Sequence, residues 1–209
     1  SNLGMRVGYT FRNDGNNAAD VELARVGALF TDRRVFNDAG VDGILGNADD
    51  GPEIVAWDIP AGNLPVSQEI ERTVSEILVQ DRALDLTLTK RMSNSWSITT
   101  NFLYNWDRDR GFIQDPNDER FNDRTVQTWS WKAFGTWNGP VGIRVTPTVR
   151  HQSGDPLARE VSVSLRTGTL TYQAEGPGAY REDNIWLFDT RVEKRFTFGE
   201  RSLGLFFDA

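Results

Sequence analysis

The sequence predicts an all-β fold, an antiparallel up-and-down transmembrane β-barrel of which residues 1–209 form about eight strands. Three observations predict it. Apolar and polar residues alternate with a period of two along most of the chain, as they do in strands whose two faces meet different environments. Tight turns alternate with long polar connections. Large aromatic residues mark both ends of the predicted strands on one face.

The alternation is clearest at 96–106, where the tryptophan, isoleucine, phenylalanine and tyrosine side chains share one face and serine, threonine and asparagine occupy most of the other. The same pattern runs through 84–91, 128–137 and 141–150, and through 5–12 near the N-terminus. Each of these segments is therefore predicted to be a strand. The segment 74–84 fits either a strand or a short helix, and its periodicity does not decide between them.

The connections between these strands fall into two length classes. Three are tight and rich in turn-forming residues, at Met92-Ser93-Asn94, Asn138-Gly139-Pro140 and Gly199-Glu200-Arg201. Two are long and polar, at roughly 107–127 and 151–184. Outer-membrane barrels place short turns on the periplasmic side and long loops outside, whereas a soluble sandwich has no reason to sort its loops in this way.

The tryptophans support a membrane placement. Trp96 and Trp106 lie on one face of the same predicted strand, and their separation corresponds to roughly 24 Å along the normal of a bilayer for a strand tilted near 45°. This matches an apolar band of about 25 Å between two aromatic girdles. Trp129 and Trp137 repeat the arrangement on the next strand in the opposite direction. In the competing interpretation, these rings fill the core of a soluble sandwich.

Charged residues occupy the other face of the strands. The sequence Asp-x-x-x-x-Lys-Arg occurs at 85–91 and again at 189–195, and each copy runs into a tight turn. Charges on an inner face are tolerated only if that face is wet, which indicates a lumen rather than a packed core.

The alternation assigns residues to the two environments. We expect the following side chains to face lipid: Leu84, Leu86, Leu88, Trp96, Ile98, Phe102, Ile143, Val145, Val149, Val192 and Leu205. We expect the following to face the lumen, where some would meet a solute: Asp85, Asn101, Lys132, Arg144, Arg150, Asp189, Arg191 and Glu193.

Composition excludes several classes of function. The net charge of −7 argues against a nucleic-acid partner, and the absence of cysteine removes disulfides, thiolate metal sites and cysteine nucleophiles. No apolar run is long enough for a transmembrane helix, and the opening residues lack the pattern of a signal peptide. The carboxylates of 107–123 have the composition of a solvated loop, His151 has no second histidine beside it, and Ser153 lacks a nucleophile pattern. The sequence therefore predicts no enzyme.

A different chemistry is suggested by 38–52, which sets four aspartates among four glycines. Counted as a calcium loop, Asp38 takes position 1, Asp42 position 5 and Asp49 position 12, with Gly43 at the sharp turn. Oxygen ligands without cysteine or clustered histidine select a hard ion. One hypothesis is thus a structural calcium site with the ligands Asp38, Asp42, Asn47, Asp49 and Asp50. The other is a solvated acidic turn on the outer side.

Three segments, 86–106, 129–160 and 187–209, carry a resemblance to a known family. Their most specific parts are Lys-Arg-x-Ser-Asn-x-Trp at 90–96, Gln-Ser-Gly-x-Pro at 152–156 and Asp-x-Arg-Val-Glu-Lys at 189–194. These segments resemble the C-terminal barrel strands of TonB-dependent outer-membrane receptors, the Oar-like group in particular. The resemblance covers most of the chain and is strongest from about residue 82 onward.

The resemblance implies that residues 1–209 are a C-terminal portion of such a barrel, without the plug, the TonB box and the final strands. It implies location in the outer membrane of a Gram-negative cell, contact with outer-membrane lipid, and active uptake of a scarce, unknown solute that TonB drives through the missing plug. Two other functions stay open at this point: an outer-membrane barrel for adhesion or scaffolding that transports nothing, and a soluble secreted β-sandwich that binds glycans through its tryptophans.

Overall fold

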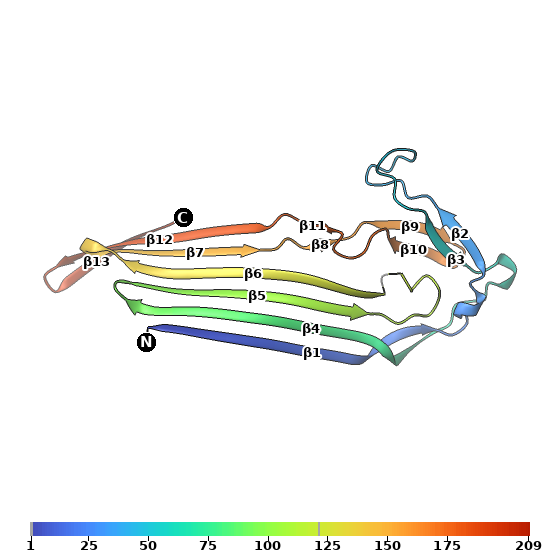
Figure 1. Ribbon diagram of the computed structural model, residues 1–209, viewed down its shortest axis with the longest axis horizontal. Coiled ribbons are helices and arrows are strands. Elements are labelled where there is room, and N and C mark those ends of the chain that lie inside the picture. The colour runs from blue at the N-terminus through green and yellow to red at the C-terminus, as the bar shows by residue number, and fades with distance from the viewer. Residues whose placement is uncertain (1, 121) are drawn as a thin grey trace.

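A computed structural model of the chain describes residues 2–120 and 122–209. The structure is all-β, and its main sheet has seven antiparallel strands in the order β1-β4-β5-β6-β7-β12-β13 (Figure 1). These strands are β1 (Leu3–Glu22), β4 (Glu69–Ser93), β5 (Trp96–Arg110), β6 (Asp123–Asn138), β7 (Ile143–Gln152), β12 (Ile185–Phe198) and β13 (Arg201–Asp208). Each strand pairs with the next one of the sheet along the chain, so the sheet is a meander with two insertions.

The two insertions contain the remaining strands. The connection from β1 to β4 holds β2 (Asp32–Phe36) and β3 (Ile54–Asp58), which pair with each other, and two short 3₁₀ turns, η1 (Gly27–Leu29) and η2 (Ala61–Asn63). The connection from β7 to β12 holds two further pairs, β8 (Pro156–Leu157) with β11 (Tyr180–Arg181) and β9 (Glu160–Leu165) with β10 (Gly168–Gln173). A third 3₁₀ turn, η3 (Pro140–Gly142), joins β6 to β7.

All long connections lie at one end of the main sheet and all short turns at the other (Figure 1). The β4–β5 turn places Asn94 at φ 51° and Ser95 at φ 68° between the paired residues Ser93 and Trp96, which is the two-residue geometry that matches strand twist. Gly199 supplies φ 62° in the β12–β13 turn. The tight turns are therefore confirmed, and below we call the two ends the turn end and the loop end.

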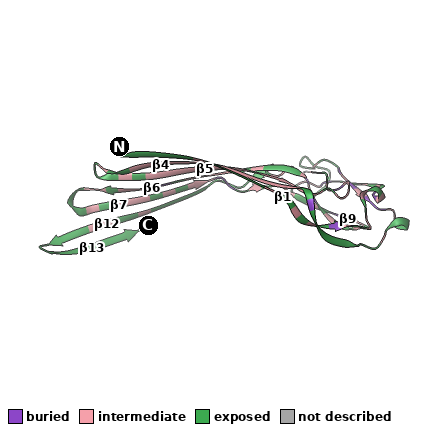
Figure 2. Cartoon of the chain, turned by 90° about the horizontal axis from the view of Figure 1, so that it is seen from below, coloured by how far each residue is buried: buried purple, intermediate pink, exposed green. Residues whose placement is uncertain are grey.

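Burial is concentrated at the loop end. Figure 2 shows that the buried residues gather there, while the strands toward the turn end are exposed or half-buried on both faces. Ile54, Ala56 and Ile59 are completely buried, and Val163 and Ala174 from the second insertion are nearly so. The inserted hairpins thus form a packed core of their own, which we call the loop-end assembly (residues 23–68, 111–120, 122 and 153–184).

The structure decides one open alternative and differs from the sequence-based expectations in three details. The segment 74–84 is strand, because it lies inside β4 and pairs with both β1 and β5. The polar connection expected at 107–127 is shorter, since β5 and β6 stay paired out to Arg110 and Asp123. The connection expected at 151–184 begins at 153 and is largely ordered into paired strands. The main sheet has seven strands rather than about eight. Among the described residues, none of the helical segments has the length and apolar character needed to span a bilayer.

Candidate functional site

The most distinctive feature of the sheet is that its two faces differ in chemistry. Residues paired directly across antiparallel strands project from the same face, so the register assigns every side chain to a face. One row, Val7, Leu86, Phe102 and Trp131, crosses four strands and is wholly apolar. The row beside it contains Arg6, Thr87, Asn101, Lys132 and Arg150. We call these the apolar face and the polar face.

The register places the side chains named from the sequence as follows. Those expected to face lipid share the apolar face: Leu84, Leu86, Leu88, Trp96, Ile98, Phe102, Ile143, Val145, Val149, Val192 and Leu205. Those expected to face the lumen share the polar face: Asp85, Asn101, Lys132, Arg144, Arg150, Asp189, Arg191 and Glu193. The environments that the two faces meet remain a prediction.

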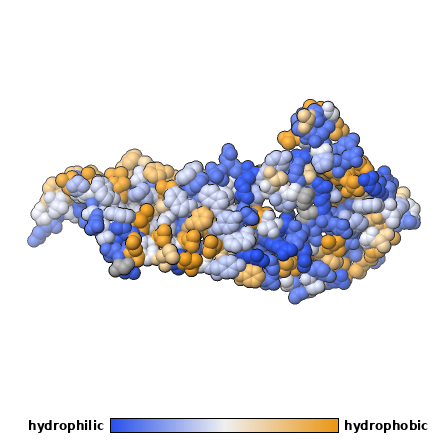
Figure 3. All heavy atoms as spheres, viewed as in Figure 1, coloured by the Kyte–Doolittle hydropathy of each residue, from blue (hydrophilic) through white to orange (hydrophobic). Residues whose placement is uncertain are grey.

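Among residues 2–120 and 122–209, no segment covers the apolar face. Leu88, Trp137, Phe188 and Leu205 are all exposed, although they lie on four different strands of one sheet. In the view of Figure 3, apolar residues gather over the strands toward the turn end, and hydrophilic residues gather toward the loop end. Soluble monomers rarely expose apolar patches beyond a few hundred Å². Such a face is typical of a surface that contacts an apolar neighbour.

A row of aromatic rings crosses the apolar face near the loop end. Tyr9 and Trp106 have ring centroids 6.3 Å apart, and Trp129 and His151 have centroids 4.7 Å apart. The His151 ring stacks on Trp186 at 3.6 Å, and its Nδ1 lies 3.3 Å from the Ile185 carbonyl oxygen. His151 thus belongs to the end of β7 and to this aromatic row, not to the long loop in which the sequence placed it.

Polar side-chain groups within the apolar face are bonded inside the protein. The Trp131 Nε1–H donates to Thr100 Oγ1 at 2.7 Å, and the Thr100 hydroxyl donates to the Lys132 carbonyl oxygen at 3.1 Å. The Tyr104 hydroxyl donates to Gln127 Oε1 at 2.7 Å. Such internal bonds matter most where no water is present to replace them.

Ion pairs and hydrogen bonds connect the strands on the polar face. Asp85 accepts bonds from Arg6, Thr87 and Asn101. Arg191 donates two bonds to Asp208, at 2.6 and 2.9 Å. A further ion pair, between Arg144 and Glu193, lies toward the turn end. This face has the chemistry of a wet surface.

The loop-end assembly is held together by buried charges. Arg159 donates to both oxygens of Asp38 at 2.5 and 2.6 Å, and to Glu175 Oε1 at 2.7 Å. The Asp38 side chain is only 1% exposed. Arg166 joins Asp32 to the buried Asp58 in the same way. The contacts of Arg159 and Arg166 with the aspartates connect the third long connection to the first, and the paired residues are more than 100 positions apart in sequence.

The second long connection is joined to the first by an asparagine. Asn117 accepts a bond from the Trp57 N–H at 2.7 Å and donates one to the Trp57 carbonyl oxygen at 3.0 Å, as a paired strand would.

Ser153 is buried, and its Oγ accepts a bond from the Trp129 N–H at 3.2 Å. Ser153 therefore extends the pairing of β7 with β6.

The structure shows the partners of the residues named for the hypothetical calcium site. The Asp38 side chain points inward to Arg159. Its carboxylate lies so close to Gly51 that a Cβ added at position 51 would clash with it. Asp49 accepts bonds from the Val41 and Asp42 N–H groups, and Asp50 accepts one from the Gly46 N–H. Within 2–120 and 122–209, no three histidine, cysteine, aspartate or glutamate residues are placed to hold a metal.

In the structure, a guanidinium pairs with Asp38, and backbone N–H groups donate bonds to Asp49 and Asp50, so these aspartates have partners without a bound cation. Asn47 and Asp42 also bond each other, at 2.9 Å.

We expect a calorimetric titration of the protein with millimolar calcium to give no saturable heat. A saturable heat that Asp42→Ala abolishes would instead establish a site at the tip of the loop.

Carboxylates within the loop-end assembly and at the adjoining end of β1 imply a dependence on pH. Hydrogen bonds from Arg159 lower the pKa of Asp38, and bonds from Ser67 and the Gln68 N–H lower the pKa of Glu22 to about 2. Groups whose pKa falls on folding stabilise the folded state above their unfolded pKa, near 4, and lose that effect as the pH drops through the folded value. We therefore expect the assembly to be equally protected from hydrogen exchange at pH 5 and 7 and to open between about pH 4 and 2. Constant protection down to pH 2 would contradict this.

A polar hollow of about 430 Å³ lies within the loop-end assembly. Its lining includes Asp109, Arg124, Asn117, Glu160 and Tyr172. Arg124 and Asp109, which are paired across β5 and β6, form an ion pair at 3.0 Å in this lining. Its donors and acceptors could contact a polar solute, but none forms an arrangement typical of catalysis.

Comparison with family models, with curated proteins and with solved structures found no match for this chain.

Sequence reasoning missed the residues that hold the loop-end assembly together. Arg159 and Asp38 are 121 positions apart, and nothing in the local pattern around either residue indicates a partner. Strand periodicity did not predict that the His151 ring would stack on Trp186 and contact Trp129 edge-on, although it places His151 on the same face as Val149. The shared face of Val149 and His151 was the one feature of the sequence that pointed to this contact.

Proposed function

We propose that this chain forms part of the wall of an outer-membrane β-barrel, with the apolar face against lipid and the polar face toward the interior. The observation that carries the proposal is the two-faced seven-stranded sheet, whose apolar face is uncovered in the described residues. A hydrocarbon environment would cover that face without a second protein layer.

Two further features support the membrane placement. The aromatic row that includes Trp106, Trp129 and Trp186 lies where a girdle would meet the lipid headgroups, and Trp96 and Trp137 lie near the turn end on the same face. The sorting of the connections by length would put the short turns in the periplasm and the loop-end assembly outside the cell.

In the full-length protein, this barrel serves as a receptor for active uptake of a scarce solute, coupled to TonB through a plug elsewhere in that protein. The support is the resemblance of 86–106, 129–160 and 187–209 to the barrel strands of TonB-dependent receptors, together with a polar face and a polar hollow that suit a hydrophilic solute. The proposed role is transport, and no catalytic step is assigned.

The two alternatives make different demands on the structure. A soluble sandwich needs a second sheet against the apolar face, and the two-stranded sheets of the described chain belong to the inserted connections instead. A barrel for adhesion is favoured by one observation, the packed loop-end assembly, which offers a rigid outer surface. Uptake measurements separate adhesion from transport.

Cysteine labelling tests the topology, and the chain contains no cysteine of its own. Val41→Cys lies in an exposed loop at the loop end, and Glu200→Cys lies in the turn between β12 and β13. A maleimide coupled to a large polymer that cannot cross the outer membrane is expected to label Val41→Cys in intact cells. It should label Glu200→Cys only after the outer membrane is permeabilised. Labelling of both in intact cells, or the reverse order, would overturn the proposed placement.

Transport is tested by comparing solute depletion from the medium by cells with and without the gene. The expected result is at least one solute whose depletion needs both the gene and a TonB system, and whose loss is restored by the complementing gene. Correct surface labelling together with identical depletion profiles would support the adhesion alternative.

A further inference from the structure

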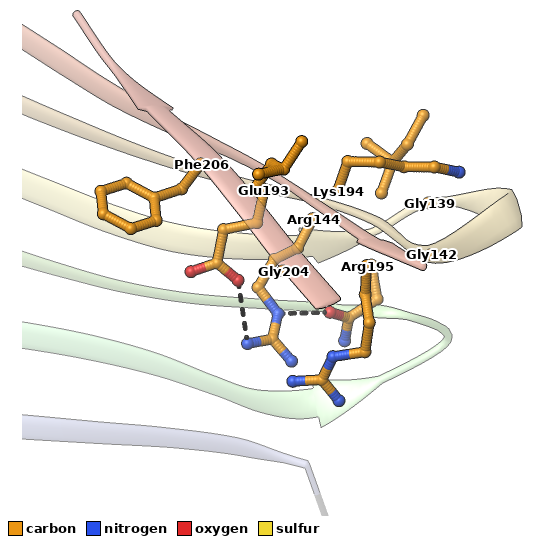
Figure 4. Close-up of a pocket in the computed structure, with 11 residues that line it drawn as sticks. Gly139, Gly142, Arg144, Glu193, Lys194, Arg195, Gly204 and Phe206 are labelled. Carbon is orange, nitrogen blue, oxygen red and sulfur yellow. Dashed lines mark hydrogen bonds and ion pairs between the residues drawn. The ribbon is translucent and has the colours of Figure 1, made fainter. Parts of the chain in front are cut away.

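A second polar pocket, which we call the turn-end pocket, lies at the opposite end of the sheet from the long connections. It has a volume of about 330 Å³ and is lined by β7, β12, β13 and the turn after β6 (Figure 4). Gly204 lies directly opposite Arg195 in the β12–β13 pairing. A Cβ added at Gly204 would have no atom within 4 Å, so the missing side chain leaves open space beside Arg195.

Two arginines contribute positive charge to this pocket. Figure 4 shows the guanidinium groups of Arg144 and Arg195 extending to the same side of the sheet, while Lys194 points away from them. Arg144 is already engaged, because its Nε donates to Asn138 Oδ1 at 3.0 Å and its Nη1 to Glu193 Oε2 at 3.5 Å. For Arg195, the described residues supply no hydrogen bond or ion pair to the side chain, which is exposed.

An aromatic ring forms the other wall. Phe206 lies on the polar face, directly opposite Glu193, and is 65% exposed. The Arg191 guanidinium lies 4.8 Å from the ring centroid, on which it can make a cation–π contact. An exposed phenylalanine among charged residues costs free energy in water, and a ligand that covers the ring recovers it.

The charges on this side of the pocket favour an anion. Arg144 and Arg195 face a single carboxylate, Glu193, and that carboxylate is already paired with Arg144. A guanidinium presents a planar fork of donors that matches a carboxylate, so Arg195 can bind one through two hydrogen bonds. The neighbouring phenyl ring adds apolar contact area.

We infer that the turn-end pocket binds a small carboxylate with an aromatic or apolar substituent. The carboxylate contacts Arg195, with Arg144 beside it, and the substituent packs on Phe206. Because these residues share the pocket through strand pairing alone, the inference does not depend on the membrane placement.

Benzoate is a suitable probe, with acetate and benzamide as its matched counterparts. Benzoate would be titrated into the full-length protein in detergent micelles at constant ionic strength, and the Nε–H signals of arginine side chains would be followed by NMR. We expect saturable shifts for Arg195 and Arg144. Acetate, which lacks the ring, should bind several-fold more weakly, and benzamide, which lacks the charge, should give no saturable shift.

Substitutions separate the contributions. Arg195→Gln should weaken benzoate binding about tenfold or more, because it removes a charge-assisted pair of bonds. Phe206→Ala should bring benzoate to the affinity of acetate while leaving acetate unchanged. Glu193→Gln should tighten binding several-fold, because it removes the one carboxylate that repels the ligand.

Arg201→Gln is the control, since Arg201 pairs with Phe198 beyond the pocket, and it should bind benzoate like the unaltered protein. Urea unfolding would establish that each variant is folded, and Arg195→Lys replaces Arg195→Gln if the latter is not. Lysine keeps the charge without the fork, so binding several-fold weaker is expected from it. The inference is overturned by no saturable shift at tens of millimolar benzoate, by an equal response to benzamide, or by unchanged affinity in a folded Arg195 variant.

Discussion

Replacing Leu86 by arginine is expected to destabilise the protein in a bilayer by about 2 to 4 kcal/mol, the cost of a charge near the centre of the lipid-facing surface of a barrel. Leu86 lies in the middle of the apolar face, in the row shared with Phe102 and Trp131. The measurement is urea unfolding of the full-length protein refolded into lipid vesicles.

Leu103→Arg is the matched control, because Leu103 pairs directly with Asp85 and so lies on the polar face at nearly the same depth. The same change of residue should cost little there, since the new guanidinium meets water and a carboxylate. Equal costs at the two positions, or a larger cost at Leu103, would show that the apolar face does not meet lipid.

Replacing Arg159 by methionine is expected to remove about 3 to 5 kcal/mol of stability from the loop-end assembly. The substitution leaves the Asp38 carboxylate buried without its counter-charge and also deprives Glu175 of its partner. Hydrogen exchange of backbone amides in 23–68 and 153–184 measures the effect locally, while amides of β4 and β5 report whether the main sheet is intact.

Two variants make this result interpretable. Arg12→Met also breaks an ion pair, with Asp14, but Arg12 is 66% exposed, so the loss of stability should be much smaller than that from Arg159→Met. Adding Asp38→Asn to Arg159→Met should recover part of the lost stability, because the buried charge is then removed. If Arg159→Met costs no more than Arg12→Met, the buried pair does not hold the assembly together.

The strands and their faces could be predicted because strand geometry is local. Successive side chains in an extended chain project to opposite sides whatever the strand pairs with, so the parity of Leu84, Leu86 and Leu88 against Asp85 was sufficient to divide the residues. Turn positions were predictable for a similar reason, since Asn94 and Gly199 adopt left-handed φ values that few residues tolerate.

The ambiguous segment 74–84 shows where this local information ends. Its apolar spacing suited a helix as well as a strand, and pairing with β1 on one side and β5 on the other decided the outcome. Backbone hydrogen bonds to both neighbours are a property of the sheet, and periodicity within one segment does not contain them.

The loop-end assembly and the turn-end pocket were decided only by tertiary structure. The aspartates of 38–50 suggested a metal loop because their own segment offers no counter-charge, but Arg159 reaches Asp38 from the second insertion. Arg195, Gly204 and Phe206 likewise form a pocket only once β12 and β13 are paired in their observed register. The sequence alone determined which residues alternate between the two faces of a strand and where the chain turns, because those properties depend on neighbours in the chain. Which charges neutralise one another depends on packing between segments far apart in sequence, and only the folded structure brings them together.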